Sequence, residues 1–373
     1  MFNMKFNIDF SSLLGSKDLI AIDIGSFSIK MVQLKGSGLK WTLVKAKTIP
    51  IPAEVVSQDV NPIEKKSILI SLLKDSIKQE KITAKSASIS VSGSSVVVRY
   101  VKFPKISKED LSKSIQFEAE PYIPFDIKEV NLGFYIIGEV TEEGQKKTET
   151  VLVAAKKDIV QQKIDILQET GLVPAIIDVD AFALESCYEI NKEPDIQEMT
   201  IIVNIGANVT NVTIIENGIS RVVRDIFIGG STFTKALQKN FQADYKQAEE
   251  MKKKHGLLVS IEDKENALKD DNKDALQVSN VLTPVAHDLL GEIHRSIDFF
   301  YSQRGEQQVL NRVLLTGGGA GMKNIEKYFT QELKIQSEIF DPFKKIDIHS
   351  IKIDNPSEYA IAVGLATRNT KEK

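Results

Sequence analysis

The chain has 373 residues, with 48 Lys and Arg against 51 Asp and Glu, which gives a formal net charge of −3. This balance argues against a general nucleic-acid binder, which needs a strongly positive surface. A single cysteine, Cys187, excludes an internal disulfide and a cysteine zinc site, and without a run of about 18 apolar residues no transmembrane helix is expected. The length suits two or three domains or one large bilobed unit.

The first 18 residues form a predicted N-terminal arm. It lacks the long apolar stretch of a secretion signal. Its apolar side chains alternate with polar ones, a strand-like pattern, at Phe2, Met4, Phe6, Ile8 and Phe10. The arm either adds to a sheet edge, docks on a partner or is mobile, and the sequence leaves these alternatives open.

Residues 19–51 predict strand, turn, strand, turn, strand, with turns at GSFS (25–28) and KGSG (35–38). An amphipathic helix follows at 61–79, then two strands around 92–95. A serine N-cap at 107 opens a helix that PYIPFD ends, because proline disfavours continuation. Strands at 132–140 and 148–155 precede a helix at 157–169, which Gly171 closes.

The first turn combines residue types that favour either a simple turn or an anion site. Asp23 ends an apolar strand, where an unpaired carboxylate costs several kcal/mol. In the site interpretation Asp23 faces a metal ion or its water, and Gly25 lets backbone N–H groups approach a phosphate. Ser26 and Ser28 would donate hydrogen bonds, and Lys30 would add positive charge.

The same architecture recurs from residue 200 onward. IAIDIGSFSIKMVQLKG aligns with IIVNIGANVTNVTIIENG, so that Asp23-Ile-Gly pairs with Asn204-Ile-Gly. A third glycine cluster, VLLTGGGAGM (313–322), follows an apolar strand and precedes a helix at 323–333. The charged helical stretch between them, 231–280, is predicted to be an insertion. Two like domains that point glycine turns at one cleft would clamp a polyphosphate.

The three turns resemble the phosphate 1, phosphate 2 and adenosine motifs of the actin, Hsp70 and sugar-kinase superfamily. The resemblance implies an α/β, actin-like fold of duplicated RNase-H-like lobes, which close over ATP and a divalent ion such as Mg²⁺. It implies that phosphates contact the first turn at Gly25, Ser26, Ser28 and Lys30 and the second at Gly206, Ala207, Asn208 and Thr210. Adenosine would lie beside Gly317, Gly318 and Gly319, where a Cβ would collide with the nucleotide.

The segment AEEMKKKHG (248–256) follows the pattern AExxKxxxG, which resembles the bacterial FtsA and PilM branch of this superfamily. The resemblance implies that Glu249 and Lys252 lie beside the ribose and base. The alternative is an i,i+3 ion pair on the surface, worth a few tenths of a kcal/mol.

The stretch SIQFEAEPYIPFDIKEVNLGF (114–134) and the closing YAIAVGLATR (359–368) resemble the PilM family of type IV pilus assembly proteins. The resemblance implies a cytoplasmic, ATP-binding adaptor that meets the inner membrane through the N-terminal tail of PilN, held in a groove between subdomains 1A and 1C. It suggests a ring or other homo-oligomer and leaves contacts with motor components open. The YIPF segment forms either an exposed partner surface or the plug of the 1C core. The residues concerned are Tyr122, Ile123, Pro124 and Phe125.

The family pattern divides the chain into two lobes. Lobe I is expected at 19–197, with the 1C insertion at about 96–156, and is completed by a C-terminal helix at 355–373. Lobe II is expected at 198–354, with a 2B-like insertion at about 235–280.

One residue departs from the family pattern, because Asn204 stands where Asp is usual. An amide can bond a metal-bound water but carries no charge, so the metal set would be Asp23 with Asn204 through water. Asp178 or Asp180 either lies near the cleft or caps the helix that begins near residue 181. We expect ATP to be bound but hydrolysed slowly or not at all. The alternatives are an FtsA-like filament-forming division protein, a small-molecule kinase, and a structural protein whose turns bind no nucleotide.

Overall fold

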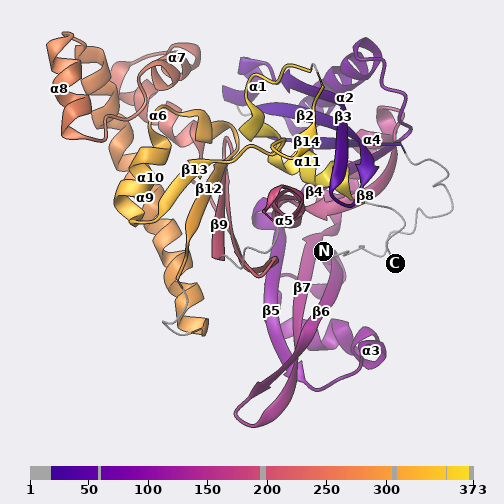
Figure 1. Cartoon of the computed structure of the whole chain (residues 1–373). Helices are drawn as coiled ribbons and strands as arrows, with labels where there is room; N and C mark the ends of the chain where they lie inside the picture. The colour runs from indigo at the N-terminus through magenta and orange to yellow at the C-terminus, as the bar shows by residue number, and fades with distance from the viewer. Residues whose placement is uncertain (1–17, 58–59, 194–198, 305–308, 350, 369–373) are drawn as a thin grey trace.

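The computed structural model describes residues 18–57, 60–193, 199–304, 309–349 and 351–368. Two large sheets and one smaller sheet organise this part of the chain (Figure 1). The N-terminal arm lies outside the described residues, apart from Asp18.

The first large sheet has the order β14-β3-β2-β1-β4-β8. Strands β1, β2 and β3 are antiparallel neighbours, whereas β4 and β8 continue parallel to β1. In sheet order the strands are β14 (Ile346–Asp347), β3 (Lys40–Pro50), β2 (Ser28–Ser37), β1 (Leu19–Ile24), β4 (Ser86–Val91) and β8 (Val173–Val179). Helices of this half are α1 (Ala53–Ser57), α2 (Pro62–Gln79) and α4 (Lys157–Glu169). Helix α2 begins where predicted, because the Asn61 side chain accepts a hydrogen bond from Ile63 N at 2.9 Å.

The second large sheet repeats this plan in the order β11-β10-β9-β12-β13. Again three strands are antiparallel neighbours and two continue in parallel. The strands are β11 (Ile219–Ile226), β10 (Thr210–Glu216), β9 (Met199–Ile205), β12 (Arg312–Thr316) and β13 (Gln336–Ile339). The predicted internal duplication is therefore confirmed, with β1, β2 and β3 corresponding to β9, β10 and β11.

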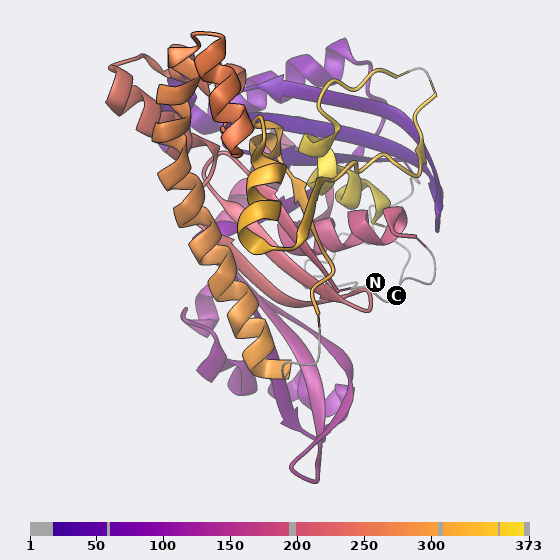
Figure 2. The same ribbon diagram turned by 60° about the vertical axis from the view of Figure 1, so that its left-hand side comes forward.

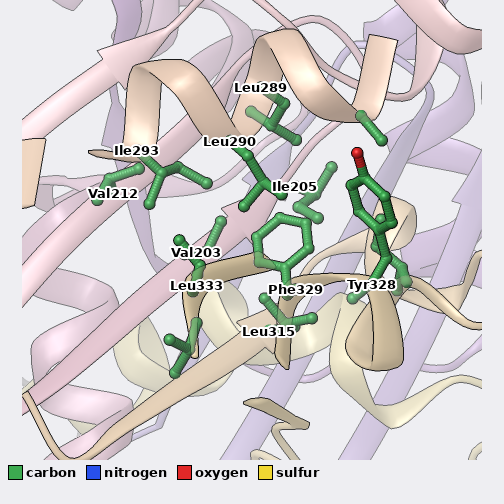
Figure 3. Packing of buried hydrophobic residues seen from close by; sticks show 14 of the residues in the cluster. Val203, Ile205, Val212, Leu289, Leu290, Ile293, Leu315, Tyr328, Phe329 and Leu333 are labelled. Carbon is green, nitrogen blue, oxygen red and sulfur yellow. The ribbon is translucent and has the colours of Figure 1, made fainter. Parts of the chain in front are cut away.

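Helices cover the second sheet, and the longest of them was only partly anticipated. They are α6 (Gly230–Phe241), α7 (Tyr245–His255), α8 (Ile261–Lys269), α9 (Lys273–Arg304) and α10 (Ile325–Leu333). Figure 2 shows α9 running along one side of the sheet. Figure 3 shows Leu290 and Ile293 of α9 and Phe329 of α10 packed over Val203 and Leu315 of the sheet. The end of the charged stretch at 231–280 is therefore the first part of a helix that packs in the core.

The small sheet has the order β5-β7-β6 and extends away from the two large sheets (Figure 1). Its strands are β5 (Val96–Pro104), β7 (Gln145–Lys156) and β6 (Val130–Glu142), and α3 (Lys108–Ala119) packs on it. The predicted N-cap of α3 is confirmed, since Ser107 Oγ accepts from Asp110 N at 3.1 Å. Short 3₁₀ turns lie at η2 (Gly93–Ser95), η3 (Glu120–Tyr122), η4 (Ile127–Glu129), η5 (Gly318–Gly321) and η6 (Pro356–Tyr359).

Two helices, α5 (Asp180–Asn191) and α11 (Ala360–Thr367), pack between the two large sheets. One apolar cluster joins them to Ala21 and Val32 of the first sheet and to Ile202 and Ile215 of the second. This cluster joins the two halves through a shared apolar core. No described helix has both the length and the apolar character needed to cross a membrane.

We expect Gly364→Ala to destabilise the protein by about 2 kcal/mol or more, because a Cβ there would overlap the backbone carbonyl of Ala183 on α5. The matched control is Gly291→Ala in α9, where a Cβ meets open space. That change should raise the free energy of unfolding by up to about 1 kcal/mol, since alanine is the better helix former. Urea unfolding measures both, and equal effects would refute the close packing.

A buried carboxyl lies where α5 meets β11. Glu185 accepts hydrogen bonds from Ser220 N, at 3.0 Å, and from the Ser220 hydroxyl. Burial raises the pKa of Glu185 to about 7. The folded chain therefore keeps a proton on Glu185 at pH values where the unfolded chain has released it.

We therefore expect the free energy of unfolding to fall as pH rises from about 4.5 to about 7, by an amount on the order of 3 kcal/mol for this group. Gln at position 185 keeps an oxygen for Ser220 but cannot ionise. Glu185→Gln should thus gain stability relative to the unsubstituted protein between pH 5 and pH 8, as measured by urea unfolding. A pH-independent difference would contradict this assignment.

Candidate functional site

A cavity of about 530 Å³ lies between the two large sheets. The turns after β1, β9 and β12 meet there, so that the three glycine segments of the sequence line one space. Its volume falls within the range of about 300–1,000 Å³ that small-molecule sites occupy.

The first two turns have the same backbone geometry. Gly25 N donates to Ser28 O at 3.2 Å, and Gly206 N donates to Val209 O at 3.0 Å. A Cβ on Gly206 would lie 2.6 Å from Val209 O, so this tight turn requires glycine. The duplication thus places two equivalent turns in the lining of one cavity.

Most of the residues predicted for the nucleotide line this cavity. They are Asp23, Gly25, Ser26, Ser28, Lys30, Asn204, Gly206, Ala207, Asn208, Glu249, Lys252, Gly317, Gly318 and Gly319. Thr210 is the exception: it is fully buried, and its hydroxyl donates to Ile228 O at 2.6 Å. This prediction was wrong because the hydroxyl closes the β10 end of the sheet and does not reach the cavity.

The glycines of the third turn are required by the protein itself at two of three positions. A Cβ on Gly317 would lie 2.6 Å from Asn204 Oδ1, and a Cβ on Gly319 would overlap the side chain of Ile205. Around Gly318, in contrast, a Cβ meets open space. The sequence argument, in which the nucleotide alone demands bare backbone, therefore applies at most to Gly318.

Glu249 and Lys252 form an ion pair of 2.5 Å, but with side chains only 13% and 11% exposed it is not the surface pair of the alternative interpretation. Lys252 Nζ also donates to Thr234 Oγ1 at 2.8 Å and to Gly230 O at 3.0 Å. Burial lowers the pKa of Lys252. Helix α7 thereby presents a pre-organised charged pair to the cavity.

Two carboxylates and a lysine from the first half line the cavity. Asp180, at the start of α5, lines it with Asp23. Burial, and then the charge of Asp23, raises the pKa of Asp180 to about 7, and burial also raises that of Asp23. Lys163 of α4 lines the same wall, and burial lowers its pKa against the opposing pull of Asp180 and Asp23.

Lys163 was missed by the sequence analysis, although a signal existed. It occupies the apolar stripe of its helix, between the buried residues Val160, Ile164 and Leu167. The charged end of a lysine in such a stripe needs a polar partner or contact with water.

The expectation that Asp178 or Asp180 caps α5 was wrong. The N-cap position is Val179, with no side-chain cap. Asp178 instead accepts a hydrogen bond from Arg368 Nε at 2.6 Å, which ties β8 to the end of α11. The other alternative, a place near the cleft, is confirmed for Asp180.

The cavity suits a metal ion that arrives with phosphates. Within the described ranges, no three His, Cys, Asp or Glu side chains group so as to hold a metal alone. Mg²⁺ usually keeps several waters and takes one or two carboxylates together with substrate phosphates. Asp23 and Asp180 supply such carboxylates, so the donor set fits Mg²⁺ with a nucleotide and not a permanent protein site.

The YIPF segment divides between surface and core. Tyr122 is 41% exposed, Pro124 is exposed and Phe125 is half-buried, whereas Ile123 is 6% exposed and belongs to the core of the small sheet. The expectation of a partner surface was therefore wrong for Ile123, which plugs that core. Lys156 Nζ lies 5.0 Å from the centre of the Phe125 ring.

A second cavity, of about 260 Å³, adjoins Pro124 and Phe125. The small sheet contributes residues 96–99 of β5, the first half contributes 179–181, and β11 with the residue that follows contributes 223–225 and Phe227. Ser92 and Asp180 line both cavities, so the two spaces are neighbours.

The chain matches the family model of type IV pilus assembly protein PilM over residues 21–370. A chain of a PilM–PilN type IV pilus biogenesis complex is similar to it with a TM-score of 0.77 and 23% identity, covering 93% of this chain and 97% of that chain. MreB5 of Spiroplasma citri bound to ADP matches with a TM-score of 0.53 and 14% identity, over 94% and 95% of the two chains. The ethanolamine utilization protein EutJ of Carboxydothermus hydrogenoformans matches at 0.51 and 13%, over 95% and 90%. At these identities the structures establish a shared fold, and the predicted two-lobed actin-like fold is confirmed.

Proposed function

Because the chain belongs to the PilM family of type IV pilus assembly proteins, we propose that it is an adaptor that binds ATP between its lobes and holds the N-terminal tail of PilN. The FtsA-like and kinase alternatives are not favoured by the family match. We assign lobe I to residues 19–197, completed by the C-terminal helix at 355–373, with the 1C insertion at about 96–156. We assign lobe II to residues 198–354, with the 2B-like insertion at about 235–280.

One observation carries the ATP proposal: equivalent glycine turns from both halves of the duplication, 25–28 and 206–209, line the same cavity. Backbone N–H groups of two such turns suit a chain of phosphates. Lys30 and Lys163 add positive charge, and the pair Glu249 and Lys252 lines the wall that we assign to the ribose and base. Similarity in fold to MreB5 bound to ADP supports a nucleotide in this position.

Asp23 and Asp180, with Asn204 acting through a water, would hold Mg²⁺ beside the phosphates. The ion would neutralise phosphate charge there. Asn204 carries no charge and cannot accept a proton as a carboxylate does, which removes one candidate for activating a water. We therefore propose that hydrolysis is slow or absent and that bound ATP serves to hold the lobes in position.

The cavity beside Pro124 and Phe125 is the place that we propose for the partner's tail. Its walls come from the small sheet and the first large sheet, as a groove between 1C and 1A requires, and β11 adds a wall from the second half. The PilM–PilN complex, to which the chain is similar, supports this partner. Through it the protein would sit at the cytoplasmic face of the inner membrane.

Isothermal titration of nucleotide-free protein with ATP in the presence of Mg²⁺ tests the proposal. We expect one ATP per chain, and turnover far below the median enzyme rate of about 10 s⁻¹ when phosphate release is followed in the same sample. No heat of binding at millimolar ATP would overturn the nucleotide proposal, and turnover at ordinary enzyme rates would overturn the proposal of slow hydrolysis.

A further inference from the structure

A row of polar side chains crosses the second large sheet from one strand to the next. Thr316 of β12 pairs with Asn204 of β9, Asn204 pairs with Asn211 of β10, and Asn211 pairs with Asp225 of β11. Directly paired residues point to the same face of a sheet, so the four side chains form one line. Asn204 lies at the cavity wall, and Asp225 lies at the edge of the sheet that faces the small subdomain.

Hydrogen bonds connect three members of this row in sequence. Asn204 Nδ2 donates to Asn211 Oδ1 at 2.7 Å, and Asn211 Nδ2 donates to Asp225 Oδ1 at 2.7 Å. The second oxygen of Asp225 accepts from Gly93 N at 2.6 Å, in the turn between β4 and β5. The chain of bonds therefore runs from the nucleotide cavity to the point where the small sheet joins the first half.

The direction of these bonds is fixed by the carboxylate at one end. A carboxylate only accepts, so Asn211 must turn its NH₂ group toward Asp225 and its oxygen toward Asn204. Asn204 must then give its NH₂ to Asn211, which leaves its own oxygen on the other side. That oxygen faces Gly317 at the cavity wall, because a Cβ built on Gly317 would lie 2.6 Å from Asn204 Oδ1.

The duplication shows how this arrangement differs from the first half. There the carboxylate, Asp23, stands on the central strand β1 and pairs across the sheet with Lys30. In the second half the equivalent positions are the two amides Asn204 and Asn211, and the carboxylate stands on β11, two strands away. Both amides are almost completely buried, although both line the cavity.

We propose that Asp225 is a positioning residue for the nucleotide site: acting through Asn211, it holds the amide of Asn204 with the carbonyl oxygen, and not the NH₂ group, toward the cleft. An oxygen there accepts a hydrogen bond from a metal-bound water, whereas an NH₂ group would repel the water's hydrogens. Asp225 thus keeps a hydrogen-bond acceptor at position 204 facing the cleft, as a carboxylate at that position would. The consequence for Mg²⁺ and ATP rests on the proposed function, whereas the orientation of Asn204 does not.

The variant Asp225→Asn should reverse the direction of these hydrogen bonds without breaking any of them. Gly93 N can donate to the new carbonyl oxygen, the new NH₂ to Asn211 Oδ1, and Asn211 Nδ2 to Asn204 Oδ1. All three bonds survive, so the variant should fold, but Asn204 now turns its NH₂ toward the cleft. In the double variant Asn211→Asp with Asp225→Asn, the carboxylate at 211 accepts from both neighbours, and Asn204 regains its original orientation.

The first measurement is isothermal titration with ATP, in Mg²⁺ and in EDTA. We expect the gain in affinity that Mg²⁺ provides to fall about tenfold in Asp225→Asn, which corresponds to the loss of about one hydrogen bond. The double variant should regain at least the original gain in affinity from Mg²⁺, because the carboxylate that it places at position 211 also lines the cavity and attracts the ion. Asp298→Asn, an exposed position on α9, is the control for loss of one negative charge and should leave the ratio unchanged.

The second measurement needs no nucleotide. Solvent exchange of the Asn204 side-chain NH₂, followed by NMR of protein labelled with ¹⁵N-asparagine, should be slow in the unsubstituted protein and in the double variant but fast in Asp225→Asn. Unchanged exchange in Asp225→Asn would overturn the positioning role even if ATP binds. If ATP fails to bind any form while exchange changes as expected, the positioning role stands and the proposed function fails.

Discussion

Replacing Gly318 by leucine should abolish ATP binding while the protein stays folded. Gly318 lines the cavity, and a Cβ built on it meets no protein atom within 4 Å. We expect a leucine side chain there to occupy part of the space that we assign to the nucleotide. We expect a loss of affinity on the order of 100-fold or more, since a side chain and a ligand cannot share close-packed volume.

The control for this variant is Gly291→Leu on α9, where a Cβ also meets open space but which lines neither of the two cavities described. It should bind ATP as the unsubstituted protein does. Isothermal titration measures affinity, and circular dichroism with urea unfolding checks the fold. If Gly318→Leu binds ATP normally, the nucleotide does not pass beside the third glycine turn.

Replacing Phe125 by alanine should weaken binding of a PilN tail peptide by about tenfold or more, because a buried aromatic anchor contributes on the order of 2 kcal/mol at an interface. Phe125 lines the cavity between the small subdomain and the first half and is held by Lys156. Fluorescence anisotropy of a labelled peptide measures the affinity.

Phe117→Ala is the matched control, because Phe117 on α3 is 78% exposed on the same subdomain but does not line this cavity. It should leave peptide affinity unchanged. Ile123→Ala, in contrast, should destabilise the subdomain by about 2–5 kcal/mol, as core truncations do. Equal loss of peptide affinity in Phe125→Ala and Phe117→Ala would place the tail elsewhere.

The large sheets could be predicted from sequence because their signals are local. The runs at 19–24 and 199–205 are apolar and β-branched, and each ends in a polar residue and a glycine turn. The repetition of this pattern predicted the duplication and, through it, the shared cavity. The Ser107 cap was predictable for the same reason, since its side chain acts on a residue three positions away.

What escaped prediction depends on contacts between distant segments. Helix α9 was hidden because a charged stretch precedes its apolar face, which packs against strands about 80 residues earlier in the chain. The role of Asp178 depends on Arg368, 190 positions away. Asp225 carried no local signal at all, because its meaning lies in the register of three strands.

The most direct test of the account is the structure of the protein determined with saturating ATP and Mg²⁺. We predict a triphosphate held between the turns at 25–28 and 206–209, with the base beside Glu249 and Lys252 and the glycines 317–319 along the adenosine. A structure with an empty cleft under these conditions, or with ATP bound elsewhere, would contradict it.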